Sequence, residues 1–234
     1  LIDITPLSLG IELHGGLTET IINRNDIIPL SVEKKYTTSH DNQTGIKVHV
    51  IQGEREFAKD NRSLAFFELK GLPKMAAGEP QLIINFTIDM DGILTVSAFE
   101  EVSGKSQIVE VRPSYGLDRD EVMSVLKNSR EHAEADMSAR IAMQNQMQIK
   151  DNIANIEKLI KDFQGFYSKA EIDDLEKEIK KVRKIDGLSY KDLDSLKSTT
   201  KKMLEKLVEK NMHIFTSSLE GKDIEKLNQS INKN

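Results

Sequence analysis

The apolar residues of this 234-residue chain change their period once, near Pro113. Before that point, short runs alternate apolar and polar residues, and Gly, Pro, Asn or Asp separates one run from the next. After it, apolar residues recur at steps of three and four among many charged residues. A period of two is typical of strands with one solvated face, and steps of three and four are typical of amphipathic helices. We therefore expect an α+β chain whose two domains segregate strands from helices.

The first part is expected to form an antiparallel β-sandwich of about eight strands within residues 5–117. Alternating runs predict strands near 7–13, 17–23, 32–39, 45–52, 64–70, 81–88, 93–99 and 106–112. Asp91-Gly92 between two of these runs is typical of a tight hairpin turn. A calcium loop is the rejected alternative for Asp89–Gly92, because no suitably placed glutamate completes the pattern.

The second part, residues 118–234, is expected to be helical. Asp118 and Glu121 have the spacing of a capping box, which predicts a helix start. Apolar residues are sparse over 118–148, so that segment is interpreted as an arm, whereas residues 149–234 are expected to form an antiparallel bundle. The apolar stripes of that bundle comprise Ile149, Ile153, Ile156, Ile160 and Phe163, then Ile172, Leu175, Ile179 and Val182, then Leu193, Leu196, Met203 and Leu207. A helix break is expected at Gly187, with a cap at Ser189.

Composition excludes several classes of function. The chain has no cysteine, which rules out disulfides and thiolate chemistry and favours a reducing compartment, with the cytoplasm as the default. Its 33 Lys and Arg residues alternate with 38 Asp and Glu residues, and the net charge is −5, so no nucleic-acid partner is expected. No apolar run has the length of a membrane span, so no membrane partner is expected either.

Catalytic and metal sites are not expected. The five histidines lack paired metal-ligand spacing. Neither GxxxxGK[ST] nor GxGxxG occurs to bind a nucleotide phosphate. Ser8, Ser63 and Ser97 lie outside any GxSxG motif and have no convincing His or Asp pairing. The sequence therefore predicts that this chain is not an enzyme and holds no cofactor.

Five ordered motifs carry a family resemblance: TPLSLGIE at 5–12, NQTG at 42–45, HVIQGERE at 49–56, NRSLAFFELKGLP at 61–73 and DMDGILTVSA at 89–98. The chain resembles the substrate-binding domain of the seventy-kilodalton heat-shock chaperones. The resemblance implies that a β-sandwich grips an extended client peptide beneath a helical lid. It also implies that residues 1–4 end an interdomain linker, and that the ATPase domain, with its ATP and Mg, lies outside this chain.

The resemblance implies a set of site residues. The peptide-binding residues would be Leu9, Ile11, Leu13, Tyr36, Thr37, Ile46, Val48 and Leu82. The same positions are also consistent with an ordinary sandwich core, and periodicity does not separate the two interpretations.

An arch over the peptide falls on His14 and Ser39, which are more polar than the residues expected in general DnaK-type chaperones. The lid contact falls on Asp41, Ala77 and Lys150. Because Ala77 stands where an Arg is expected, the usual latch is predicted to be missing.

Two further segments, VRPSYGL at 111–117 and SLEGKDIEKL at 218–227, resemble the branch of the family that is specialised for iron–sulfur cluster assembly. That branch implies a bacterial cytoplasmic chaperone whose client is the iron–sulfur scaffold protein, bound through a Leu-Pro-Pro-Val-Lys segment. A J-domain cochaperone would assist the full-length protein. The alternatives are a general chaperone for unfolded chains, a structural or adaptor module, and, least favoured, an enzyme.

Overall fold

The computed structural model describes residues 3–219, and the side chains of residues 3–217. Within this range the chain forms ten strands, three α-helices and three short 3-10 helices, so the α+β class is confirmed. The first two residues of the expected linker end lie outside the described residues. So do the last part of the expected bundle and most of the motif at 218–227.

The chain divides into two compact units, residues 1–137 and 138–234. This division falls within a helix rather than at its start. The sequence-based domain limits, 5–117 and 118–234, stay a prediction, and each compact unit is described below by itself.

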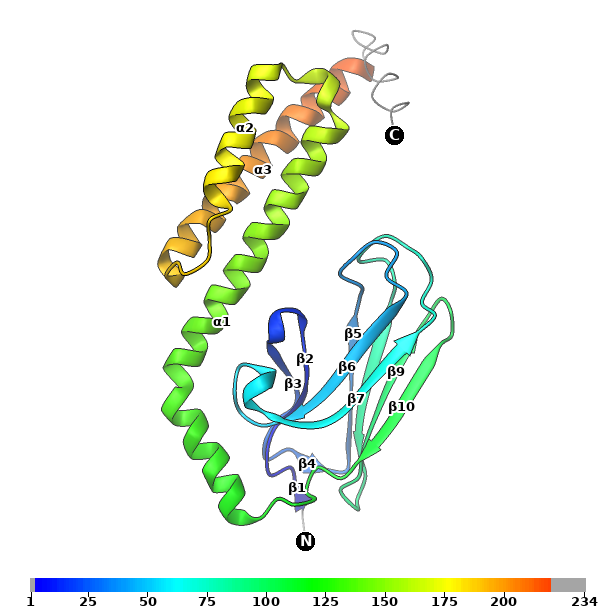
Figure 1. Cartoon of the computed structure of the whole chain (residues 1–234). Coiled ribbons are helices and arrows are strands. Elements are labelled where there is room, and N and C mark those ends of the chain that lie inside the picture. Colours follow the sequence, from blue (N-terminus) through cyan, green and yellow to red (C-terminus); the bar gives the residue numbers. More distant parts are fainter. Residues whose placement is uncertain (1–2, 220–234) are drawn as a thin grey trace. The chain divides into compact units, whose positions relative to one another are not determined.

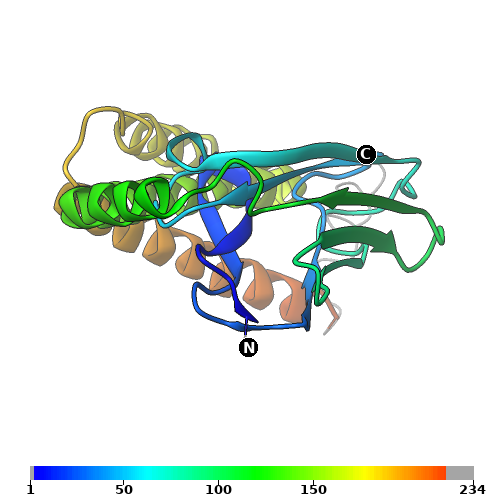
Figure 2. The same ribbon diagram turned by 90° about the horizontal axis from the view of Figure 1, so that it is seen from below.

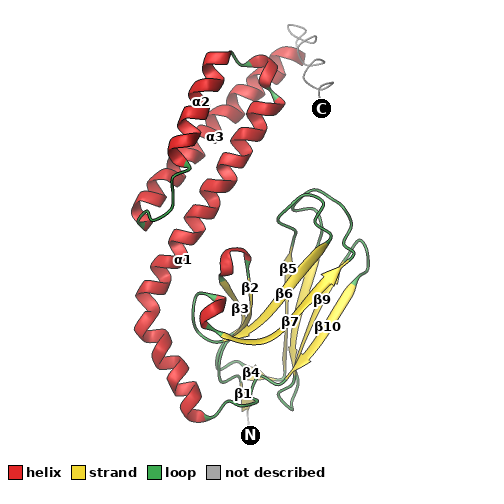
Figure 3. Cartoon of the chain, viewed as in Figure 1, coloured by secondary structure: helices red, strands yellow, loops and turns green. Residues whose placement is uncertain are grey.

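The first unit contains two four-stranded antiparallel sheets (Figures 1 and 3). One sheet has the order β3-β2-β6-β7, with bounds Thr18–Ile22, Leu9–Glu12, Gly45–Gln52 and Arg62–Lys70. The other has the order β10-β9-β8-β5, with bounds Ser106–Val111, Leu94–Glu100, Leu82–Ile88 and Leu30–Tyr36. These eight strands lie close to the eight alternating runs of the sequence.

A third sheet was not expected. It pairs β1 (Asp3–Ile4) with β4 (Ile27–Ile28), near the N-terminal end of the chain (Figures 1 and 2). The structure thus has ten strands in three sheets, instead of about eight strands. Strands of two residues are too short to show a period of two, which is why the sequence pattern missed them.

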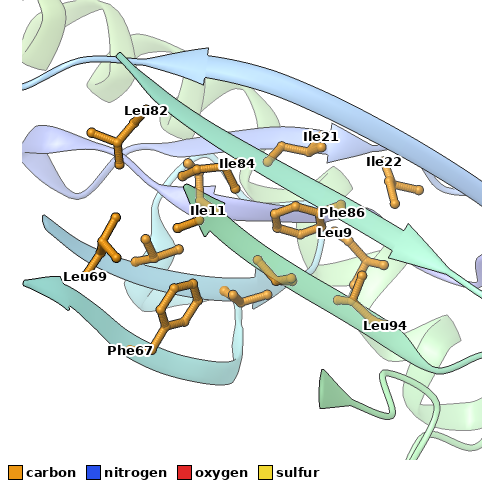
Figure 4. Close-up of a cluster of buried hydrophobic side chains, with 14 of the residues drawn as sticks. Leu9, Ile11, Ile21, Ile22, Phe67, Leu69, Leu82, Ile84, Phe86 and Leu94 are labelled. Atoms are coloured by element: carbon orange, nitrogen blue, oxygen red, sulfur yellow. The ribbon is translucent and has the colours of Figure 1, made fainter. Parts of the chain in front are cut away.

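Both four-stranded sheets contribute to one hydrophobic cluster (Figure 4). Leu9 and Val48 enter it from the first sheet, and Leu82 and Phe86 enter it from the second. Each of these four side chains is at most 2% exposed. The alternation that the sequence shows over 82–88 therefore places one face of β8 in this core.

The turn between β8 and β9 confirms the hairpin interpretation of the DMDG motif. The Asp89 carboxylate accepts hydrogen bonds from the backbone N–H groups of Asp91 and Ile93, at 2.9 Å each. Gly92 has a φ of +73°, a conformation that glycine adopts without strain.

The predicted helix start at Asp118 is also confirmed. The Asp118 carboxylate accepts a bond from the Glu121 N–H at 2.8 Å, and Glu121 accepts one from the Asp118 N–H at 2.9 Å. This capping box begins α1 (Arg119–Asp162), a single helix of 44 residues. The predicted arm and the first stripe of the predicted bundle are thus parts of one helix.

In the second unit, α2 (Lys169–Val182) and α3 (Tyr190–Leu219) share a hydrophobic cluster with the second part of α1. Ile149, Ile156 and Leu193 are fully buried in it. The expected break and cap are present, because Gly187 has a φ of +77° and Ser189 Oγ accepts a bond from the Asp192 N–H at 3.2 Å. The three predicted apolar stripes therefore lie on packed helices.

Candidate peptide-binding site

Two loops of the first unit, one after β5 and one after β7, are tied together by hydrogen bonds. The Asn42 N–H donates to the Met75 carbonyl oxygen at 2.8 Å, and the Ala77 N–H donates to the Asp41 carboxylate at 2.8 Å. We call these two loops, residues 37–44 and 72–80, the joined loops. The structure thus brings together two of the three residues predicted for the lid contact.

The short helix at His14–Gly16, between β2 and β3, meets the joined loops through a pair of histidines. The rings of His14 and His40 lie edge to face, with centroids 6.4 Å apart and planes at 80°. Ser39 Oγ lies 2.9 Å from His40 Nδ1. The ring that contacts His14 therefore belongs to His40, a residue that sequence reasoning missed, and Ser39 orients that ring.

The predicted peptide-binding residues differ in burial. Leu9, Ile11, Val48 and Leu82 are at most 4% exposed. Leu13, Tyr36 and Ile46 are partly buried and pack against the same cluster, whereas Thr37 is exposed. In this conformation, surface for a ligand comes from the three partly buried residues and Thr37. Their role in peptide binding stays a prediction.

Tyr36 adds one polar group to this region, and its hydroxyl is buried. Burial raises the pKa of its phenol, and the neighbouring Glu19 carboxylate raises it further. Glu19 is also paired with Lys34 at 2.8 Å. The Tyr36 hydroxyl is therefore neutral at physiological pH and is able to donate a hydrogen bond.

The third residue of the predicted lid contact, Lys150, is exposed on α1 and belongs to the second unit. Its contact with Asp41 or Ala77 stays a prediction.

A different attachment of α1 is present inside the first unit. Arg55, in the loop after β6, donates from Nε and Nη2 to the two carboxylate oxygens of Asp136, at 2.5 and 2.9 Å. Its Nη1 donates to Asn128 Oδ1 at 2.6 Å. The side chains of Arg55 and Asp136 are only 12% and 11% exposed. This bidentate pair joins α1, well beyond its first turn, to the loop that follows β6.

The charges of this pair perturb each other. The hydrogen bond from Arg55 holds the pKa of Asp136 below its usual value, against the opposing effect of burial. The sequence offered one signal for this contact. Asp136 lies on the same helical stripe as Val122, Leu126 and Ser129, so an acidic residue occupies a position where an apolar one is usual.

Comparisons with known proteins agree with the motifs. Residues 1–217 match the family model described as Hsp70 protein. The chain belongs to the Hsp70 family.

Three of its curated relatives carry the name "Chaperone protein HscA homolog". The protein of Rickettsia bellii (strain RML369-C) is 45% identical over 97% of this chain and 38% of its own length. The Rickettsia felis protein is 41% identical over 96% of this chain and 36% of its own length. The Rickettsia typhi protein is 50% identical over 68% of this chain and 27% of its own length. The chain thus spans less than two fifths of these relatives and is HscA-like.

The family match corrects two sequence predictions. We expected a chain that is not an enzyme and that holds no cofactor. The Hsp70 model matches residues 1–217, and the resemblance describes that family as ATP-driven. Because the chain belongs to this family, the expectation that it is not an enzyme and the expectation that it holds no cofactor are both wrong.

Residues 3–219 contain no group of three Asp, Glu or His side chains placed to hold a metal ion. The sequence also lacks both glycine-rich phosphate-binding patterns. In the same range, no helix has the length and apolarity needed to cross a membrane.

Proposed function

We propose that this chain is the client-binding part of an Hsp70-family chaperone, with residues 5–117 as a peptide-binding β-sandwich and residues 118–234 as its helical lid. An extended client segment would lie between the loops at 13–17 and 39–45. The observation that carries the proposal is the contact of His14 with His40 between these loops, beside partly buried apolar side chains. Loops that meet over an apolar surface enclose an extended chain better than a flat sheet face does.

The energy of such a site is sufficient for reversible binding. Burying one Leu or Val anchor gives about 1.5–3 kcal/mol. Each net hydrogen bond to the peptide backbone adds about 0.5–1.5 kcal/mol, before ordering costs are subtracted. A dissociation constant near 1 μM, about −8 kcal/mol, is the expected scale.

We infer that the client is the iron–sulfur scaffold protein, recognised through a Leu-Pro-Pro-Val-Lys segment. Similarity to HscA homologues supports this choice. Proline fixes φ and lowers the cost of ordering an extended peptide. The net charge of −5 favours a client that carries a lysine. For the whole protein, the proposal includes ATP-driven control, a J-domain cochaperone and a cytoplasmic location.

Fluorescence anisotropy with three labelled peptides tests the proposal. Leu-Pro-Pro-Val-Lys is expected to bind more tightly than its scrambled version and than an unrelated Leu-rich peptide. Equal binding of the first and third peptides would indicate a general DnaK-type chaperone instead. Absence of binding by all three, from a folded sample, would refute client binding by this chain.

A matched pair of variants locates the site. Ile46→Asn changes a partly buried residue of the expected groove, and Ile108→Asn makes the same change at a residue of β10 that is 57% exposed. Loss of an anchor contact worth about 1.5–3 kcal/mol weakens binding by roughly 10- to 150-fold for the first variant. The second variant is expected to bind as the parent does. Equal affinities for the two variants would exclude Ile46 from the site.

A further inference from the structure

Three side chains on one face of the first sheet form a hydrogen-bonded chain that peptide binding does not explain. His49 Nδ1 on β6 lies 2.6 Å from Glu12 Oε2 on β2. His49 Nε2 lies 2.8 Å from Ser63 Oγ on β7. The imidazole thus joins a carboxylate on one side to a hydroxyl on the other.

The strand register explains why these residues meet. Ser63 pairs with Ile51, which lies two residues after His49 on β6, so the side chains of Ser63 and His49 share one face. A register shift between Val50 and Ile51 adds a bulge to β7 next to Ser63. Bulges redirect a neighbouring side chain, which brings the hydroxyl within reach of the imidazole.

The environment holds the imidazole but leaves the hydroxyl accessible. The His49 side chain is 21% exposed and the Glu12 side chain is 38% exposed, whereas Ser63 is an exposed residue. The ring of Phe66 lies 5.8 Å from the His49 ring, centroid to centroid, and restricts its orientation. A reagent from solvent therefore reaches Ser63 without any rearrangement of the base.

The sequence-based view that Ser63 has no His or acidic partner is wrong. Glu12 lies 37 positions before His49, and Ser63 lies 14 positions after it. Only the pairing of β2, β6 and β7 brings the three together, so no local motif marks them.

We propose that Ser63 is an activated nucleophile that accepts an acyl group from activated acyl esters. In this step Ser63 Oγ attacks the carbonyl carbon, and its proton passes to His49 Nε2. The bond from that carbon to the leaving oxygen breaks, and the alcohol or phenol departs with the electron pair. Glu12 stabilises the imidazolium until His49 returns the proton to the leaving group or to water. The product is an ester of Ser63.

The described contacts supply a base and an acid that orients it, but they supply no pair of donors for an oxyanion. For this reason we assign a single acyl modification of Ser63 and not repeated turnover. The assignment is independent of the client-binding proposal, because it rests on other side chains.

The same chain contains an internal control. Ser39 Oγ also contacts an imidazole nitrogen, His40 Nδ1, at 2.9 Å, and this serine is exposed too. Among the described contacts of His40, none is with a carboxylate. Ser39 therefore reports the reactivity of a serine–histidine pair without the acid.

The test treats the whole chain with p-nitrophenyl acetate and follows acetylation residue by residue by peptide mass spectrometry. Ser63 is expected to react at least tenfold faster than Ser39. Loss of a general base costs roughly 100-fold or more, so His49→Gln is expected to reduce the rate at Ser63 by that factor. Glu12→Gln is expected to reduce it less, and Ser63→Ala removes the label. None of these variants is expected to change the rate at Ser39.

Two results would overturn the proposal. One is acetylation of Ser63 no faster than that of Ser39 in the unaltered chain, a comparison that requires no variant to fold. The other is an unchanged rate at Ser63 in His49→Gln, with thermal unfolding like that of the parent. Peptide anisotropy on the same samples reports client binding separately, so failure of one proposal does not decide the other.

Discussion

Removing the charge of Asp136 tests whether the Arg55 pair holds α1 to the loop that follows β6. Asp136→Asn keeps the shape of the side chain but leaves the Arg55 guanidinium, which is 12% exposed, without its bidentate partner. Breaking a buried pair from one side costs about 3–5 kcal/mol. Asn128 still accepts one hydrogen bond, and Asp60 lies 3.9 Å away. We therefore expect the loss of free energy of unfolding to fall near the lower end of this range, roughly 3 kcal/mol.

Two measurements read out this loss. Denaturant unfolding gives the change in free energy, and hydrogen exchange of the amides in residues 119–137 shows whether α1 detaches locally. Glu134→Gln is the control, because it neutralises an exposed acid on the same helix. Surface changes of this kind stay within about 0.5 kcal/mol. The double variant Arg55→Met, Asp136→Leu is expected to recover most of the lost stability, since an apolar pair replaces a buried ion pair at little cost.

The pH dependence follows from the sign of the Asp136 shift. Because Arg55 lowers the pKa of Asp136 in the folded protein, the stabilising contribution is complete above the unfolded value of about 3.9. It is lost as the pH falls through the lower folded pKa. Asp136→Asn is expected to lack this part of the acid sensitivity.

A change below about 1 kcal/mol in Asp136→Asn, together with unaltered exchange over residues 119–137, would refute the role of this pair. Equal acid sensitivity of parent and variant would lead to the same conclusion.

Three further substitutions probe the fold. Gly10→Ala places a Cβ 2.0 Å from a backbone oxygen of β3, whereas the control Gly165→Ala creates no clash. Denaturant unfolding is expected to show a loss of about 1–3 kcal/mol in the free energy of unfolding for Gly10→Ala only. Glu100→Gln removes a buried carboxylate. Burial tends to raise the pKa of Glu100, but the hydrogen bonds that it accepts in the β9–β10 turn lower its pKa by more. A loss of roughly 1–3 kcal/mol at neutral pH, fading as the pH falls below the unfolded value, is expected from the unfolding free energy at several pH values. Ser168→Ala breaks the capping box of α2 and is expected to cost about 1 kcal/mol, measured as a loss of helical circular dichroism on heating; an unchanged melting curve would contradict that role.

Sequence periodicity located the long strands and the helices because each has one buried face. Ile149, Ile153 and Ile156 recur at steps of four and three, and all three are buried in the helical cluster. The alternation over 82–88 likewise places one face of β8 in the sheet cluster. Residues of this kind are predictable, since burial of one face imposes its period on the chain.

The same reasoning does not reach contacts that depend on tertiary pairing. Val48 has the same alternation whether it lines a groove or fills a core, and its exposure of 2% is a property of the two packed sheets together. Asp136 stands out on its helical stripe, but Arg55 lies 81 positions before it, and no local sequence pattern identifies the two residues as partners. The ring that contacts His14 belongs to His40, one position after the predicted Ser39. Matching positions to a family does not show which of two adjacent side chains makes such a contact.

The joined loops have a consequence for which substitutions this edge of the protein tolerates. Asn42 and Met75 are linked through backbone atoms, and at position 77 the bond uses the backbone N–H of Ala77. Exchanges of the Met75 or Ala77 side chain therefore preserve the donors and acceptors that hold the loops in place. Single substitutions at these two positions are therefore expected to change the surface at this edge of the protein while leaving the loop conformation intact, so a small library here would test whether the edge takes part in the proposed client binding.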